Sequence, residues 1–285
     1  MINLLRSEWV KFRSVRSTIV TLLLAGGLVI VVALLSARTV NDDFTERCEP
    51  VAAGSPTTTT TTPVLEPGET GEIAIENWCG EGMEVVRELS LNHLTNLTVG
   101  VSIATLLFGA LGVQVIGQEY RFNTIRPTFT AAPRRIPVLI AKLVIVAVAC
   151  AAVSLVMVAV CALVGTTMID NFEIDGVDQR LFWAIPLFGA LWAMAGVGVG
   201  AIVRQPIAAI LILLGWSLVA EGIIAAMFDW THKWLPFNNG MQMTLRVEPG
   251  MQQTLRPILD GGIYFAVVCA ALFAIGVILA NRRDA

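Results

Sequence analysis

Six long apolar blocks limit what this chain can fold into more than any other feature of its sequence. A helix needs about 20 mostly apolar residues to cross ~30 Å of hydrocarbon. The blocks span residues 18–37, 97–116, 136–164, 182–203, 207–227 and 263–280. They lack the alternation of polar and apolar residues that strands of a membrane barrel require. The sequence therefore predicts an all-α integral membrane protein with six transmembrane helices.

The composition agrees with that prediction. Only 14% of the 285 residues are charged and 55% are hydrophobic, whereas globular chains carry about 25% charged residues. The first block is interpreted as a retained span and not as a signal peptide. Its apolar core exceeds the usual 7–15 residues, and a helical stretch too long for a signal peptide precedes it.

The distribution of cations predicts the orientation. If the amino terminus lies inside, six crossings bring both termini inside, and the inner segments then hold twelve of the 19 Lys and Arg residues. Lys and Arg near span ends set topology, whereas Asp and Glu contribute little. We therefore expect a multi-pass protein with both termini in the cytoplasm.

Residues 1–16 have the pattern of an amphipathic helix. Apolar side chains recur at helical spacing, and cations lie to one side of that stripe; the residues of interest are Leu5, Trp9, Phe12 and Arg13. Such a helix can lie flat at the lipid headgroups. The alternative is a plain basic flank that only sets orientation. The remaining residues, 17–285, form the six-span domain.

The outer insertion at residues 38–96 contains a threonine run that is expected to be a disordered linker, and the role of the whole segment is open between a spacer, a glycosylated stalk and a partner site. Six consecutive threonines, residues 57–62, give it too few apolar groups to pack. Cys48 and Cys79 flank this run and can form a disulfide if this side is oxidising, worth about 3–4 kcal/mol in loop-entropy models. Three further cysteines, Cys150, Cys161 and Cys269, lie in the spans and are expected to act as small hydrophobic residues.

The inner segment between the second and third spans, residues 117–142, combines arginines with prolines at 127, 133 and 137. Proline interrupts helices, so short helices and sharp turns are expected. The arginines could serve orientation alone, but the polar residues packed among them favour a docking surface.

Two features of the later spans predict specific packing. Gly196, Gly198 and Gly200 allow another backbone to approach the fourth span closely. In the third outer segment, Trp230, Trp234, Pro236 and Phe237 suit an aromatic belt with short helices at the membrane surface.

The sequence carries no catalytic, metal-binding or nucleotide-binding motif. It lacks HExxH, a CxxC pair, GxSxG and GxxxxGK[ST], so no enzymatic activity, no metal and no bound cofactor are expected. Glu221 is the one acid within a span. An intramembrane carboxylate indicates function by default, and the alternatives are a transport or gating role, or a structural polar contact.

Three stretches carry a resemblance to a known family. They are SEWVKFRSVRST at the amino terminus, GQEYRFNTIRPTFTAAPRR followed by VLIAK, and GVGVGAIVRQPIAA between the fourth and fifth spans. In this order and spacing, the chain resembles ABC-2 type transporter permeases of the actinobacterial kind, with a type V exporter-like architecture. Asn123 and Pro127 depart from the family pattern, which commonly has glycine and threonine there.

The resemblance implies a permease subunit of an ATP-binding cassette exporter in a bacterial plasma membrane. ATP and magnesium would bind to a separate cytoplasmic ATPase subunit, and a second permease copy or a related permease would complete the pathway, with no nucleic acid involved. The amino-terminal helix and the first inner loop would meet the ATPase. The coupling candidates that match the family run, with two further arginines of the loop, are Glu119, Tyr120, Arg121, Thr124, Arg126, Arg134 and Arg135.

The main competing hypothesis is a non-transport membrane protein, such as an immunity, sensing or scaffold subunit. It would also lack catalytic groups, but it would not need the inner loop to engage an ATPase. An intramembrane enzyme and an ion-coupled carrier are disfavoured, because the catalytic groups and a proton relay are both missing.

Overall fold

A computed structural model describes residues 2–40, 44–50, 83–89, 94–122, 135–169, 172, 174, 176–245 and 257–282. Within these residues, six helices are long and apolar enough to cross a membrane, which confirms the predicted number of spans. The spans are Arg16–Arg38, Val99–Arg121, Ile136–Met168, Leu181–Val203, Pro206–Met227 and Ile258–Arg282. The chain is thus a multi-pass membrane protein.

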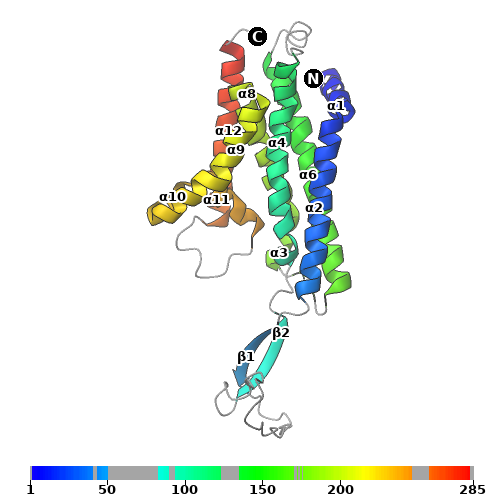
Figure 1. Ribbon diagram of the computed structural model, residues 1–285, viewed down its shortest axis with the longest axis vertical. Helices are drawn as coiled ribbons and strands as arrows, with labels where there is room; N and C mark the ends of the chain where they lie inside the picture. The colour runs from blue at the N-terminus through cyan, green and yellow to red at the C-terminus, as the bar shows by residue number, and fades with distance from the viewer. Residues whose placement is uncertain are drawn as a thin grey trace, which may run out of the picture.

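The spans form an elongated bundle (Figure 1). Its helices are α2 (Arg16–Val40), α4 (Val99–Arg121), α6 (Arg135–Met168), α8 (Leu181–Val203), α9 (Pro206–Leu214) with α10 (Glu221–Met227), and α12 (Ile258–Arg282). The start of α1 (Ile2–Ser14) and the end of α12 lie at one end of the bundle, here called the termini end. The opposite end is called the hairpin end.

Helix α8 is the central helix of the bundle. Its glycines lie against backbone of two neighbours: Gly196 faces Gly109 of α4, and Gly198 faces the Leu272–Phe273 peptide of α12. Gly200 lies against Val113 of α4. A Cβ at any of these glycines would require a neighbouring atom to move. Close backbone approach is how small residues let membrane helices pack, and the prediction for these three glycines is confirmed.

A tight turn joins α8 to α9 at the termini end. Arg204 has φ 61°, the one positive φ among described non-glycine residues, and its N–H donates to the carbonyl of Gly200 at 2.9 Å. Gln205 is extended and Pro206 begins α9. Proline is favoured in the first turn of a helix because its φ is already helical and no N–H is needed there. The turn therefore reverses the chain in very few residues.

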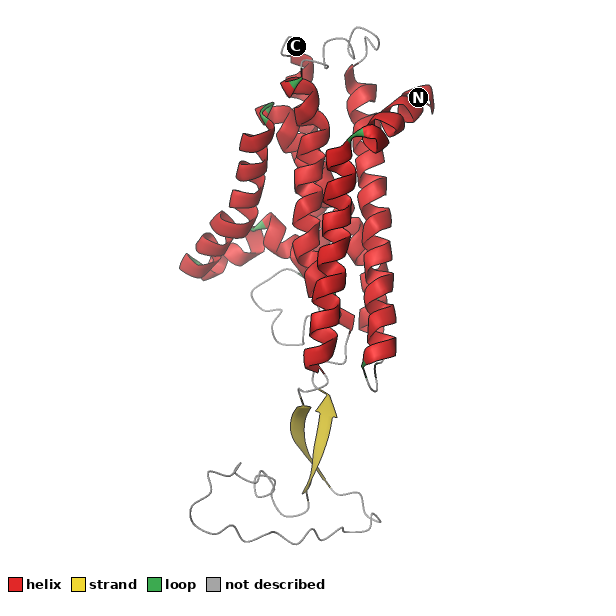
Figure 2. Cartoon of the chain, turned by 45° about the vertical axis from the view of Figure 1, so that its right-hand side comes forward, coloured by secondary structure: helices red, strands yellow, loops and turns green. Residues whose placement is uncertain are grey.

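The fifth span leans away from the rest of the bundle (Figures 1 and 2). It consists of α9, a π-helical segment Gly215–Ala220 and α10. Most of its large apolar side chains are exposed, Leu211 and Met227 among them. Such a face suits lipid or another protein surface and not water.

At the hairpin end, an antiparallel pair of strands extends beyond the helices (Figure 2). Strand β1 (Phe44–Pro50) pairs with β2 (Met83–Leu89), with Cys48 opposite Val85. These strands were not predicted from the sequence. Cys79 and the threonine run lie outside the described residues, so the proposed disulfide does too. The membrane part is helical, as predicted.

The hairpin end is also stabilised by a buried acid. Asp178, in α7 (Gly176–Gln179), is fully buried and accepts hydrogen bonds from the Leu94 N–H at 3.1 Å and the Thr95 hydroxyl at 3.2 Å. These donors open α3 (Leu94–Leu97). A carboxylate stabilises a helix start by accepting from its free N–H groups. Asp178 of α7 therefore stabilises the start of α3 through these two hydrogen bonds.

The segment after the fifth span contains short helices, as predicted: a 3₁₀ turn Asp229–Trp234, α11 (Pro236–Met241) and a 3₁₀ turn Gln242–Thr244. Trp230 and Trp234 are exposed, as an aromatic belt requires. Phe237 is not part of that belt. It is buried and packs against Trp192 of α8 and Phe265 of α12, because α11 turns back towards the bundle.

Candidate functional site

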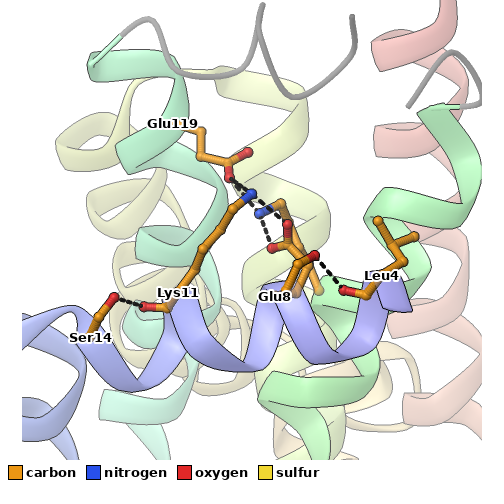
Figure 3. A network of polar contacts seen from close by, with 7 residues as sticks. Leu4, Glu8, Lys11, Ser14 and Glu119 are labelled. Carbon is orange, nitrogen blue, oxygen red and sulfur yellow. Dashed lines mark hydrogen bonds and ion pairs between the residues drawn. The ribbon is translucent and has the colours of Figure 1, made fainter. Parts of the chain in front are cut away.

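Four charged side chains meet at the termini end, and we call them the ion cluster: Glu8 and Lys11 of α1, Glu119 of α4 and Lys142 of α6. Helix α1 runs across the ends of the spans, so its inner face lies over α4 and α6 (Figure 3). The cluster therefore joins a peripheral helix to two transmembrane helices.

Lys142 is the centre of the cluster. Its ammonium donates to Glu8 Oε2 at 2.5 Å and to Glu119 Oε1 at 2.6 Å. The side chains of Lys142 and Glu8 are only 3% and 4% exposed. A buried charge is tolerated when it is paired and hydrogen-bonded, and here a single ammonium serves two carboxylates from two different helices.

Lys11 completes the charge balance. Its ammonium lies 2.6 Å from Glu8 Oε1 and 3.6 Å from Glu119 Oε1, and its side chain is 47% exposed. Two ammoniums and two carboxylates give the cluster no net charge. Figure 3 shows Lys11 extending from α1 towards Glu119. Lys11 is the outer member and Lys142 the inner one.

The surroundings shift the pKa values of the α1 pair. Burial alone would raise the pKa of Glu8, but the ammoniums of Lys142 and Lys11 outweigh it and hold that pKa below its usual value. Burial would likewise lower the pKa of Lys11, but its hydrogen bond to Glu8 and the charges of Glu8 and Glu119 raise it. Both groups are therefore held in their charged forms.

A cavity of about 520 Å³ lies beside the ion cluster. Its other walls come from α1, α2, α4 and α6 and are mainly apolar, as with Phe12, Val115 and Ile145, although Gln118 and Thr18 also line it. The contact between α1 and the spans thus rests on ion pairs along one side and leaves open space along the other.

The apolar residues predicted to lie along one side of α1 are partly buried and partly exposed. Phe12 is buried and Leu5 partly buried against the main core, whereas Trp9 is 48% exposed. Arg13 is exposed. The inner face of α1 also carries Glu8, which the sequence analysis did not assign to this face.

The predicted coupling residues at the end of α4 lie in different environments. Glu119 points into the ion cluster and is 13% exposed. Arg121 is exposed, with its guanidinium 5.6 Å from the ring of Phe122. Tyr120 lies under the guanidinium of Arg204 at 5.2 Å, so α4 also contacts the α8–α9 turn. Thr124, Arg126 and Arg134 are outside the described residues, and Arg135 begins α6.

Sequence reasoning singled out Glu119 but missed Glu8, Lys11 and Lys142. The sequence did contain a sign that Glu8 and Lys142 are each paired. Glu8 lies four residues before Phe12 on the apolar side of α1, and Lys142 follows the apolar start of α6. A charge on an apolar helix face must find a partner. The sequence could not tell which partner, because Glu8 and Lys142 are 134 positions apart.

Glu221, the intramembrane acid predicted from the sequence, begins α10 in the fifth span and is far from the ion cluster. Its carboxylate is buried and accepts from the N–H groups of Phe237 at 3.1 Å and Asn238 at 2.8 Å. Both N–H groups belong to the first turn of α11, so Glu221 joins α10 to α11 as a polar contact.

The described residues hold no group of three or more His, Cys, Asp or Glu side chains placed to bind a metal ion. Comparison of the chain with known protein-family models finds no match, and no curated protein matches it.

Proposed function

We propose that this chain is the membrane-spanning permease subunit of an ATP-binding cassette exporter, with ABC-2 architecture and a separate cytoplasmic ATPase. The observation that carries the proposal is the ion cluster, which links α1 to α4 and α6. In the family that the sequence resembles, the amino-terminal helix and the first inner loop meet the ATPase. Glu119 lies near the end of α4, which leads into that loop.

The geometry supports transfer of movement from α1 to the spans. The exposed face of α1, with Trp9 and Val10, is available to a partner, while the opposite face is tied to two spans by short ion pairs. A displacement of α1 must move α4 and α6 or break those pairs. Different contacts of a partner in its ATP-bound and ATP-free states would therefore favour different arrangements of the spans.

The proposal assigns the energy source to another polypeptide. The chain carries no phosphate-binding loop, so ATP and magnesium belong to the ATPase, and the chain itself is not an enzyme. The exposed apolar face of the fifth span suits contact with a second permease copy or a related permease in the plasma membrane. The proposed topology places both termini and the ion cluster on the cytoplasmic side.

The experiment purifies the tagged chain from its native membrane, identifies any ATPase that co-purifies, and measures ATP hydrolysis by that ATPase reconstituted with the chain in nanodiscs. We expect co-purification of the two proteins and stimulated hydrolysis. The double substitution Lys142→Met with Glu119→Gln leaves Glu8 and Lys11 paired on α1 but removes the ionic link to the spans. This variant should still bind the ATPase and lose the stimulation.

Asp260→Asn is the matched control, because Asp260 is an exposed acid at the opposite end of α12. It should leave stimulation unchanged. A chain that binds no ATPase would instead favour the alternative of an immunity, sensing or scaffold subunit. Stimulation that survives in a folded double variant would show that the ion cluster does not transmit the movement.

A further inference from the structure

A second cavity, of about 280 Å³, lies between the leaning fifth span and the bundle. Its walls come from α4, α8, the π-helical segment, α10 and α11, and Figure 1 shows α10 and α11 beside the bundle. It is lined by Glu221, by the aromatic rings of Phe188, Trp192 and Phe237, and by the hydroxyls of Thr105 and Ser217. We call it the Glu221 cavity.

Glu221 brings a negative charge to this cavity without a matching cation. The residue is 2% exposed, and no ion pair between described residues includes it. Its two oxygens accept from the backbone N–H groups of Phe237 and Asn238. These partners donate protons and cannot accept one, so the arrangement suits a carboxylate. A carboxylate has about four lone-pair sites, and capacity remains for a ligand.

The aromatic wall of the cavity is the second, independent observation. The rings of Trp192 and Phe237 lie 4.7 Å apart between centroids, and those of Phe188 and Trp192 lie 6.3 Å apart, edge to face. Aromatic faces attract cations, most strongly when water is excluded. Trp192 is only 3% exposed, so its ring is shielded from water, which strengthens its attraction for a cation.

We propose that the Glu221 cavity binds the cationic group of a lipophilic organic cation, with the Glu221 carboxylate as its counter-ion and the aromatic rings as its walls. The volume suits an ammonium or amidinium group with a small ring and not a whole drug-sized molecule. The apolar remainder lies along the exposed side chains of Trp216 and Leu218 beside the cavity. That such a cation is the exported substrate rests on the proposed function; that it binds here does not.

The test uses the purified full chain in nanodiscs without any ATPase, so it does not depend on the proposed function. The probe is benzyltrimethylammonium, and its neutral isostere, neopentylbenzene, is the control ligand. Binding is followed by tryptophan fluorescence and by calorimetry. We expect the ammonium to bind at least about tenfold more tightly than the isostere, which corresponds to a difference in binding free energy of about 1.4 kcal/mol.

Two variants assign the binding to this cavity. Glu221→Gln should weaken binding of the ammonium at least about tenfold and leave the weak binding of the isostere unchanged. Trp192→Phe keeps an aromatic ring and removes the Nε1 donor, and it should weaken the ammonium less. Asp260→Asn, which changes an exposed acid that does not line the cavity, should change nothing. Equal binding of the two ligands, or ammonium binding that survives Glu221→Gln in a folded protein, would overturn the proposal.

The same chemistry could come from a lipid headgroup, and the nanodisc composition distinguishes the two sources. In discs of phosphatidylglycerol alone, the probe should bind fully. If phosphatidylethanolamine displaces the probe from the wild-type chain, the ammonium headgroup of a lipid occupies the site. If phosphatidylethanolamine has no effect, the site takes a free organic cation. Either result supports recognition of a cation by Glu221.

Discussion

Glu8 and Glu221 are both buried acids in a membrane protein, but they are stabilised in different ways. Glu8 has two ammonium partners, one from its own helix and one from α6. Glu221 has two backbone N–H donors from α11. The ion cluster balances its charges within itself, whereas no ion pair between described residues includes Glu221, which lines a cavity. The ion cluster therefore joins α1 to α4 and α6, whereas Glu221 keeps unused hydrogen-bond acceptor capacity beside a cavity.

The comparison predicts the largest loss of stability at Lys142. Lys142→Met leaves the carboxylates of Glu8 and Glu119 close together, with only the partly exposed Lys11. Removing one partner of a buried ion pair costs about 3–5 kcal/mol. Denaturant unfolding of the detergent-solubilised chain measures this cost.

A second substitution checks that the cause is the unbalanced charge left buried in the cluster. Adding Glu119→Gln to Lys142→Met leaves one carboxylate and one ammonium, so the double variant should be more stable than the single one. Lys233→Met, which removes an exposed lysine, is the control and should be close to wild type. If the single and double variants are equally stable, charge pairing does not hold α1 in place.

At Glu221 the expected loss is smaller and local. Glu221→Ala leaves the N–H groups of Phe237 and Asn238 without acceptors, which costs about 2–3 kcal/mol because the bonds are to a charged group. Hydrogen exchange at these two amides should rise, while amides of α8 keep their protection. A rise of similar size across the whole bundle would mean that Glu221 supports more than α11.

Acid should weaken the ion cluster once the pH falls below the ordinary range of a glutamate, because Glu8 must be protonated for its ion pairs to break. The pKa of Glu8 lies below its ordinary value of 4.5 in the folded state. Its contribution is therefore fully present above pH 4.5 and is lost as the pH falls through the lowered pKa. A Glu8→Gln variant should lack this part of the acid dependence of the unfolding midpoint. An identical acid profile for the two proteins would contradict the shift.

The smallest effect is expected at the outer edge of the cluster. Lys11 is half exposed, and solvent-exposed ion pairs contribute about 0–1 kcal/mol. Lys11→Met should therefore cost far less than Lys142→Met, and the difference should shrink little in high salt because Lys142 is buried. Equal costs at the two lysines would show that burial does not separate the two ends of the cluster.

Much of the fold followed from sequence alone. The six apolar blocks predict the six spans, and glycines in the fourth block predict the close approach of α8 to its neighbours. The sequence also predicted short helices between the fifth and sixth spans. It did not predict the β1–β2 strands, because their residues lack a continuous alternating pattern and their pairing joins segments on either side of a long insertion.

What the sequence determined by itself is the length and order of the helices, because burial in hydrocarbon depends on the local run of apolar residues. What only the tertiary structure decided is which charges meet. Glu119 and Lys142 are 23 positions apart, Glu8 and Lys142 are 134 apart, and Glu221 reaches a helix start 16 positions later. Charge pairing depends on distances in space, which are set by how the helices pack and by the way α1 and α11 turn back onto the bundle.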